Sequence, residues 1–148
     1  MSIRSNRPVT VSATTLTLNR NIHDNKVIRL TSTTGCAVTL PLATGTGAKF
    51  TVVLGAQLAS GSVAVAASST DTFTGYAIVE DAGDTTAADA TIFATVNGTT
   101  DTWTSAATGG GGEIGDHIEC VDIATGLWLV RAWGQAVLDS TATPFSGS

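Results

Sequence analysis

The sequence predicts an all-β protein: a compact antiparallel β-sandwich or barrel with an extended N-terminal arm and a C-terminal tail. Threonine and valine are abundant among its 148 residues, and residues branched at Cβ suit a pleated strand better than a helix. Short stretches alternate apolar and polar residues, which is typical of half-buried strands. Turn signals recur about every ten residues, a spacing typical of sandwiches and barrels. A chain of this length fits one domain, which we expect to cover residues 1–148.

The first forty residues predict the arm and four short strands. Residues 1–8 are polar and basic, and Pro8 ends the arm because proline lacks a backbone N–H and biases the residue before it toward extended geometry. The segment 19–25 is polar and predicts a connection. In the strand that follows it, Arg29 should point away from the face of Ile28 and Leu30. The predicted strands cover residues 9–12, 16–18, 27–31 and 35–40.

The middle of the chain predicts a glycine-rich turn and three further strands. Residues 44–47 contain paired glycines, which supply positive φ angles at little cost. Residues 50–54 are nearly all apolar, so we expect a strand that is buried on both faces. Residues 62–66 and 73–79 also have the composition and alternation of strands.

Residues 87–96 leave two interpretations open, because alanine permits a helix whereas threonine, isoleucine and valine favour a strand. The Asn-Gly pair at 97–98 predicts a hairpin turn to a return strand, 102–104, around Trp103. Residues 109–112 are all glycine and predict a flexible loop.

The clearest hairpin joins residues 117–123 to residues 127–137. Gly126 suits the left-handed position of the three-residue turn between them. The tail, residues 139–148, should lie on some other surface, with Phe145 as its only apolar anchor.

The second strand of this hairpin should carry one tryptophan on each face, because Trp128 and Trp133 differ by an odd number of residues. Leu127, Leu129 and Arg131 share the face of Trp133. Arg131 is the only basic residue among residues 50–148, so its face is the less suited to a core. We therefore expect Trp128 in the core and Trp133 at an interface, unless a β-bulge shifts the strand.

Charge is divided along the chain. Residues 1–49 hold six basic residues and one acid, a net charge of +5, whereas residues 50–148 hold one basic residue and eleven acids, a net charge of −10. Such a division suits a protein whose basic part meets an acidic partner while the remainder faces solvent. Charged residues make up only 13% of the chain, which predicts that neighbouring molecules cover much of the surface.

The sequence contains no catalytic signature, and we expect no enzyme. The glycines at 109–112 lack the Lys-Ser/Thr pair of a phosphate-binding loop, and no GxSxG elbow is present. His23-Asp24 and Asp116-His117 are adjacent pairs, and neighbours on a strand point to opposite faces. Both pairs are therefore interpreted as surface or turn residues.

Acidic residues gather in two places. Asp81, Asp84 and Asp89 could hold Ca²⁺ through carboxylate oxygens, but their spacing does not match an EF-hand loop. We expect a solvated turn there, and no metal or other cofactor. The second stretch predicts a solvated or partner-facing edge; it contains Glu113, Asp116, Glu119 and Asp122.

The two cysteines are interpreted as buried free thiols, with a disulfide between Cys36 and Cys120 as the alternative. No apolar segment follows the basic start, so we expect no secretory leader. No apolar run reaches membrane-spanning length, so we expect no membrane partner.

Three segments resemble a group of small proteins encoded among the head genes of tailed bacteriophages, the capsid decoration or cement proteins. They are residues 38–54 (VTLPLATGTGAKFTVVL), 115–131 (GDHIECVDIATGLWLVR) and 142–145 (ATPF). The resemblance covers about residues 16–146, and its motifs are strands and turns. The chain departs from the group's pattern in its additional tryptophan and cysteine.

The resemblance implies a virion protein made in the bacterial cytoplasm, which binds the major capsid protein on the outer surface of the head as a homotrimer and binds no nucleic acid. Charge then suggests a shell-binding set, namely Arg4, Arg7, Arg20, Lys26 and Arg29. A trimer or shell interface would hold Arg131, Trp133 and Phe145. The alternative is a trimeric receptor- or carbohydrate-binding domain of a fibre or tail, which would use Trp133 or Tyr76.

Overall fold

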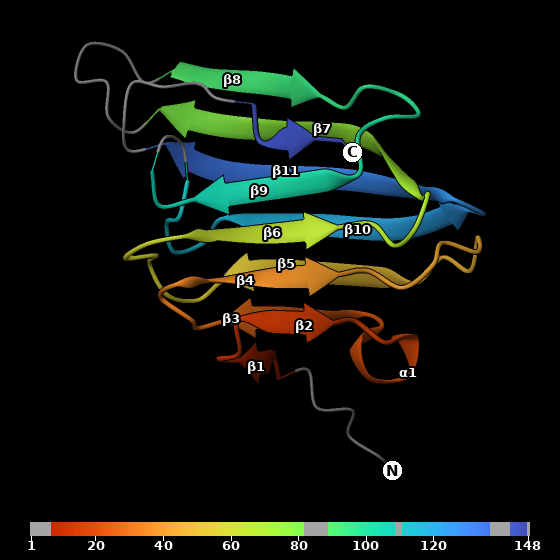
Figure 1. Cartoon of the computed structure of the whole chain (residues 1–148), viewed down its shortest axis with the longest axis horizontal. Helices are drawn as coiled ribbons and strands as arrows, with labels where there is room; N and C mark the ends of the chain where they lie inside the picture. Colours follow the sequence, from red (N-terminus) through yellow and green to blue (C-terminus); the bar gives the residue numbers. More distant parts are fainter. Residues whose placement is uncertain (1–6, 82–88, 109–110, 137–142, 148) are drawn as a thin grey trace.

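The chain folds into two β-sheets packed face to face, so the predicted β-sandwich is confirmed (Figure 1). The computed structural model describes residues 7–81, 89–108, 111–136 and 143–147. Arg4, Asp84, the first six residues of the predicted arm and half of the predicted tail (139–142 and 148) lie outside these ranges. None of the helices in the described ranges is long and apolar enough to cross a membrane.

The large sheet has seven strands in the order β1-β3-β5-β10-β11-β7-β8. In Figure 1 it runs from β1 at the bottom to β8 at the top. Its strands are β1 (Val9–Val11), β3 (Lys26–Leu30), β5 (Lys49–Leu54), β10 (His117–Ala124), β11 (Leu127–Ala136), β7 (Thr72–Asp81) and β8 (Asp89–Ala94).

The small sheet has five strands in the order β12-β9-β6-β4-β2. Its edge strand β2 lies at the same end of the sandwich as β1 (Figure 1). Its strands are β12 (Phe145–Ser146), β9 (Thr102–Ala106), β6 (Ser62–Ala66), β4 (Gly35–Thr39) and β2 (Thr15–Thr17).

Both sheets are mixed, whereas the sequence predicted antiparallel pairing. The parallel pairs are β1 with β3, β3 with β5, β11 with β7, β2 with β4, and β4 with β6. Four of these pairs arise because the chain alternates between the two sheets from β1 to β6, so that successive strands of one sheet start from the same end. The fifth pair joins β7 to β11, which are far apart in the chain. The final hairpin, β10–β11, joins two consecutive strands directly, as predicted, and the consecutive strands β7 and β8 also pair antiparallel.

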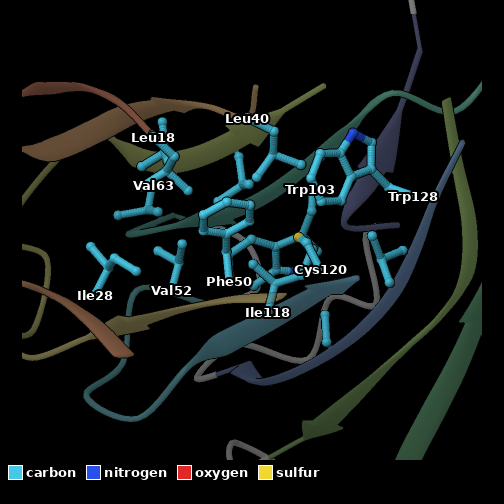
Figure 2. Close-up of a cluster of buried hydrophobic side chains, with 14 of the residues drawn as sticks. Leu18, Ile28, Leu40, Phe50, Val52, Val63, Trp103, Ile118, Cys120 and Trp128 are labelled. Atoms are coloured by element: carbon cyan, nitrogen blue, oxygen red, sulfur yellow. The ribbon is translucent and has the colours of Figure 1, made fainter. Parts of the chain in front are cut away.

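The core lies between the sheets and is built on the inward residues of the central strands (Figure 2). Trp128 and Phe50 have no exposed surface, and their ring centroids lie 5.8 Å apart in a tilted arrangement. Trp103 of the small sheet is also buried. Trp128 is therefore a core residue, as its position in the hairpin predicted. Within the described part of the chain its indole Nε1 has no hydrogen-bond partner.

Several local predictions are corrected. The segment 19–25 contains a short helix, α1 (Arg20–His23), because the Asn19 side chain accepts a hydrogen bond from the Asn21 amide and caps its first turn. Strand β5 is buried on one face only, since Thr51 and Val53 are half-exposed on the outer face.

The Asn97-Gly98 turn and the C-terminal segment also differ from the predictions. The turn links β8 of the large sheet to β9 of the small sheet, so it is not a hairpin. The Asn-Gly pair favours a turn, but it does not determine whether the strands on either side of the turn pair with each other. Phe145 anchors β12 against Trp103 of the chain's own small sheet, so this part of the tail does not need another molecule.

Candidate functional site: the outer face of the large sheet

The outer face of the large sheet is organised in rows of side chains that cross the strands. Strand register places His117 opposite Trp133, Trp133 opposite Ile78, and Ile78 opposite Ile92. We call these four residues the apolar row, because three of them are large apolar side chains. Within the row, the Trp133 side chain is 39% exposed and the Ile92 side chain is 68% exposed.

The next row along the strands is polar. Glu119 lies opposite Arg131, and Arg131 lies opposite Tyr76. Tyr76 is 42% exposed. Directly opposite side chains on neighbouring strands come within about 5.5 Å at Cβ, so Arg131 has an aromatic neighbour on one side and a carboxylate on the other.

The two rows enclose a shallow hollow of about 390 Å³ at the centre of the face. Its lining combines aromatic rings, a guanidinium, an imidazole, a carboxylate and a threonine hydroxyl. The lining residues are Thr51, Tyr76, Ile78, His117, Glu119, Arg131, Ala132 and Trp133. A rigid sheet thus presents groups that can bind a partner by stacking, ion pairing and hydrogen bonding at once.

Only some of the charged side chains on this face form ion pairs within the described part of the molecule. Lys49 forms an ion pair with Glu119, with 2.5 Å between Nζ and Oε2. Within the described part of the chain, the side chains of Arg131 and Glu80 make no hydrogen bond or ion pair. Both lie on this face of the sheet, since Glu80 is two residues beyond Ile78 on β7.

The predicted shell-binding residues fall into two groups. Arg7, Lys26 and Arg29 lie at the β1–β3 edge of the large sheet, and Arg7 and Lys26 line one surface hollow. Arg29 is exposed and points away from the core, as predicted, and donates a hydrogen bond to the Gly55 carbonyl. We call these three residues the basic edge. Arg4 lies outside the described residues.

Arg20 is engaged within the molecule. Its guanidinium forms an ion pair of 2.8 Å with Asp122 and donates to the Leu42 carbonyl. Asp122 is fully buried, so the prediction that it lies on a solvated or partner-facing edge is wrong. The carboxylate also accepts hydrogen bonds from the Thr44 and Gly45 amides. It therefore holds the glycine-rich turn against the final hairpin.

The protonation of Asp122 is set by two opposing effects. Burial raises its pKa, because a charged carboxylate is poorly solvated inside the protein. The bonds from Arg20, the Gly45 and Thr44 amides and the Thr46 hydroxyl lower it by more, so the pKa lies well below its ordinary range. The Asp122 carboxylate is therefore ionised in the folded protein at neutral pH.

Asp116 is a second buried acid, so its interpretation as a surface or turn residue is corrected. Its carboxylate accepts hydrogen bonds from the Ser105 hydroxyl at 2.7 Å and from the Gln135 amide at 3.0 Å. Burial is the largest influence and raises the pKa above its ordinary range, although the hydrogen bonds oppose this. Asp116 joins β9 to the start of β10 and to β11, which is a structural role.

Other candidate reactive groups are also held in structural positions. His23 is buried in α1, and its Nδ1 accepts a hydrogen bond from the Asn19 amide. Cys36 and Cys120 are buried free thiols, as predicted, and burial raises the pKa of both. A raised pKa keeps them as unreactive thiols.

Asp81 and Asp89, which belong to the first of the two acidic groups in the sequence, do not form a metal site within the described residues. Asp81 lies opposite Asp89 across the β7–β8 pair, and no group of three or more potential ligands is positioned for a metal.

The structure thus brings Arg131 and Trp133 together, but separates them from Phe145, which is buried in the core. Tyr76, Ile78 and Ile92 join the site through strand pairings that the sequence did not predict. The chain matches no protein-family model, no curated protein and no solved structure.

Proposed function

We propose that the protein is a structural component of a tailed-bacteriophage head, which binds the outer surface of the shell as a homotrimer and stabilises it. The observation that carries this proposal is the basic edge formed by Arg7, Lys26 and Arg29 at one end of the large sheet. Acidic residues Glu80, Asp81 and Asp89 lie at the opposite end, on β7 and β8. A molecule with basic residues at one end and acidic residues at the other can bind an acidic surface through its basic end.

The proposed partner is the major capsid protein, contacted through the basic edge together with Arg4. Arg20 is left out of this set, because its guanidinium holds the buried carboxylate of Asp122 and so has a structural role. Individual exposed ion pairs contribute little free energy. Three copies of the same edge in a trimer would add their contacts, and avidity would supply retention on the shell. No catalytic step is part of this function.

The direct experiment is co-sedimentation of purified protein with emptied, expanded phage heads. Deletion of residues 1–8, or reversal of Arg4 and Arg7 to glutamate, should weaken binding while the variant stays folded. The loss should be largest at low salt, because exposed charges are screened beyond about 10 Å at 0.1 M ionic strength. Thr104→Glu, which adds a negative charge on the small sheet, is the control and should bind normally. Binding that is indifferent to the deletion and to salt contradicts the proposal.

A carbohydrate- or receptor-binding role is the second candidate, and the hollow beside Trp133 and Tyr76 is the observation that favours it. Heating separates the two functions. A cement protein raises the temperature at which expanded shells lose their integrity, because it binds the intact lattice. A receptor-binding domain leaves that temperature unchanged.

A further inference from the structure

Strand β8 is an edge strand without the features that normally protect one. Its sequence is DATIFA, with no lysine, no proline and one charged residue, and it pairs only with β7 among the described strands. Exposed apolar edges of this kind invite pairing with another chain, so natural proteins usually blunt or cover them. At the opposite edge, β1 is three residues long and follows Pro8 and Arg7.

The apolar row leads directly to this edge. Trp133, Ile78 and Ile92 lie opposite one another on β11, β7 and β8, so large apolar side chains continue from the hollow to the rim of the sheet. Tyr76 and Arg131 border the row. Tryptophan, tyrosine and arginine are the residues that contribute most to protein interfaces. The composition therefore suits a protein partner.

The charges that flank the apolar row have opposite signs. Arg131 lies on one side and Glu80 on the other, because Arg131 pairs with Tyr76 and Glu80 follows four residues later on β7. That offset is about 13 Å along a strand. Neither side chain has an ionic partner within the described part of its own chain. Because the two signs lie on opposite sides of the apolar strip, the Arg131 side of one copy is complementary to the Glu80 side of the next, a head-to-tail contact that can close into a ring.

We infer that this surface, comprising the apolar row, Arg131, Glu80 and the β8 edge, is where copies of the chain contact one another. In a closed ring, each copy gives Arg131 to one neighbour and Glu80 to the other, and the apolar rows are buried between them. The inference rests on the proposed homotrimer and names its contact surface. The basic edge lies at the other end of the sheet, away from this contact surface.

The test is a charge-reversal cycle read by sedimentation equilibrium and light scattering of the full chain. Arg131→Glu and Glu80→Arg should each raise the concentration at which the assembly dissociates by about tenfold or more, because each places like charges together. The double variant Arg131→Glu/Glu80→Arg should recover most of the loss. Ile92→Lys should dissociate the assembly through its apolar part.

Val27→Lys is the matched control, since Val27 is an exposed apolar residue on the same face near the opposite edge. It should leave the mass unchanged. Circular dichroism should show all variants folded, because every altered side chain lies on the outer face. Single reversals that leave the mass unchanged, or a double variant that does not recover, overturn the inference.

A measurement of head binding distinguishes the two proposals. Variants that keep the assembled mass but lose head binding would assign this surface to the shell, which overturns the inference and leaves the proposed function intact. A wild-type chain that assembles through this surface but does not bind heads would overturn the proposed function alone.

Discussion

Trp128 and Trp133 lie five residues apart on one strand, yet truncating them should have different consequences. Trp128 has no exposed surface and contacts Phe50, so Trp128→Ala should lower the free energy of unfolding by about 3–5 kcal/mol. Trp133→Ala should leave the fold nearly as stable and weaken assembly or head binding, because its ring is partly exposed. Urea denaturation and light scattering of both variants check this.

Trp128→Phe is a useful companion variant. It keeps most of the buried apolar volume and removes an indole N–H that has no partner among the described residues. Its cost should therefore be well below that of Trp128→Ala. A reversal, in which Trp133→Ala unfolds the protein and Trp128→Ala is nearly silent, would contradict the assignment of the two faces.

Asp122 should make the fold acid-sensitive. Its pKa in the folded protein lies below the ordinary value of about 3.9, so its ionised form stabilises the fold above that pH and the contribution is lost as the pH falls further. Asp116 acts in the opposite sense, because its raised pKa means that the folded state takes up a proton more readily than the unfolded chain.

Asp122→Asn should therefore destabilise the protein by about 2–3 kcal/mol at neutral pH, since it removes a charged hydrogen-bond acceptor. Its stability should converge on that of the wild type as the pH falls below about 4. Thermal melts of both proteins from pH 7 to pH 2 give the comparison. A constant difference across this range would show that the carboxylate charge is not the source of the stability.

The groups that hold the buried carboxylates of Asp116 and Asp122 could not have been identified from the sequence. Alternation along β10 placed Glu119 correctly on the outer face, and the same alternation puts Asp116 and Asp122 on the inner face. Inward carboxylates are costly unless they find donors. Their donors come from Arg20, the 44–47 turn, Ser105 and β11, which are distant in sequence. Only the tertiary fold reveals them.

At the scale of the elements, Gly75 allows β7 and β11 to approach each other. Its φ is +148°, and a Cβ atom at this position would come within 1.8 Å of the Val130 carbonyl oxygen. The Thr95 hydroxyl also accepts a hydrogen bond from the Gly75 amide at 3.0 Å. Gly75→Ala should therefore separate the strands locally and lower the melting temperature strongly.

Gly47→Ala is the control for Gly75→Ala, because a Cβ atom at Gly47 meets nothing within 4 Å although its φ is also positive. It should cost only the backbone strain of an alanine in the left-handed region, about 1–2 kcal/mol. Equal losses in the two variants, measured by calorimetry, would show that strand approach at Gly75 is unimportant.

Strand existence was easier to predict than strand pairing. Period-two alternation located β6 and the final hairpin closely, because a half-buried strand must alternate. It could not show that β7 pairs in parallel with β11, since such partners are not adjacent in the chain. The prediction of the outer face is limited most by this. Alternation predicts that Trp133 is exposed, but only the strand register shows that Ile78 and Ile92 lie beside it.

For the whole molecule, we predict a stable homotrimer in solution. The apolar strand β5 does not contribute to this expectation, because it lies inside the sheet and buries its inner face. The expectation now rests on the exposed apolar row and the unprotected β8 edge, which together form the kind of patch that monomers rarely expose. Light scattering over a dilution series at micromolar concentration should give three times the mass of the chain. A monomer throughout the series would count decisively against it.

The ladder between β7 and β11 also sets the order in which the polypeptide can acquire its structure. It joins residues 72–81 to residues 127–136 over ten paired positions. During synthesis, β7 and β8 therefore wait without their main neighbour until β11 has been made. The hairpin β10–β11 joins strands that are neighbours in the chain, so it can form early and recruit β5 and β7 from either side. Non-local pairing of this kind slows folding, and the waiting strands are the ones that carry the exposed apolar residues, so nascent chains depend on rapid closure of this ladder to avoid aggregation.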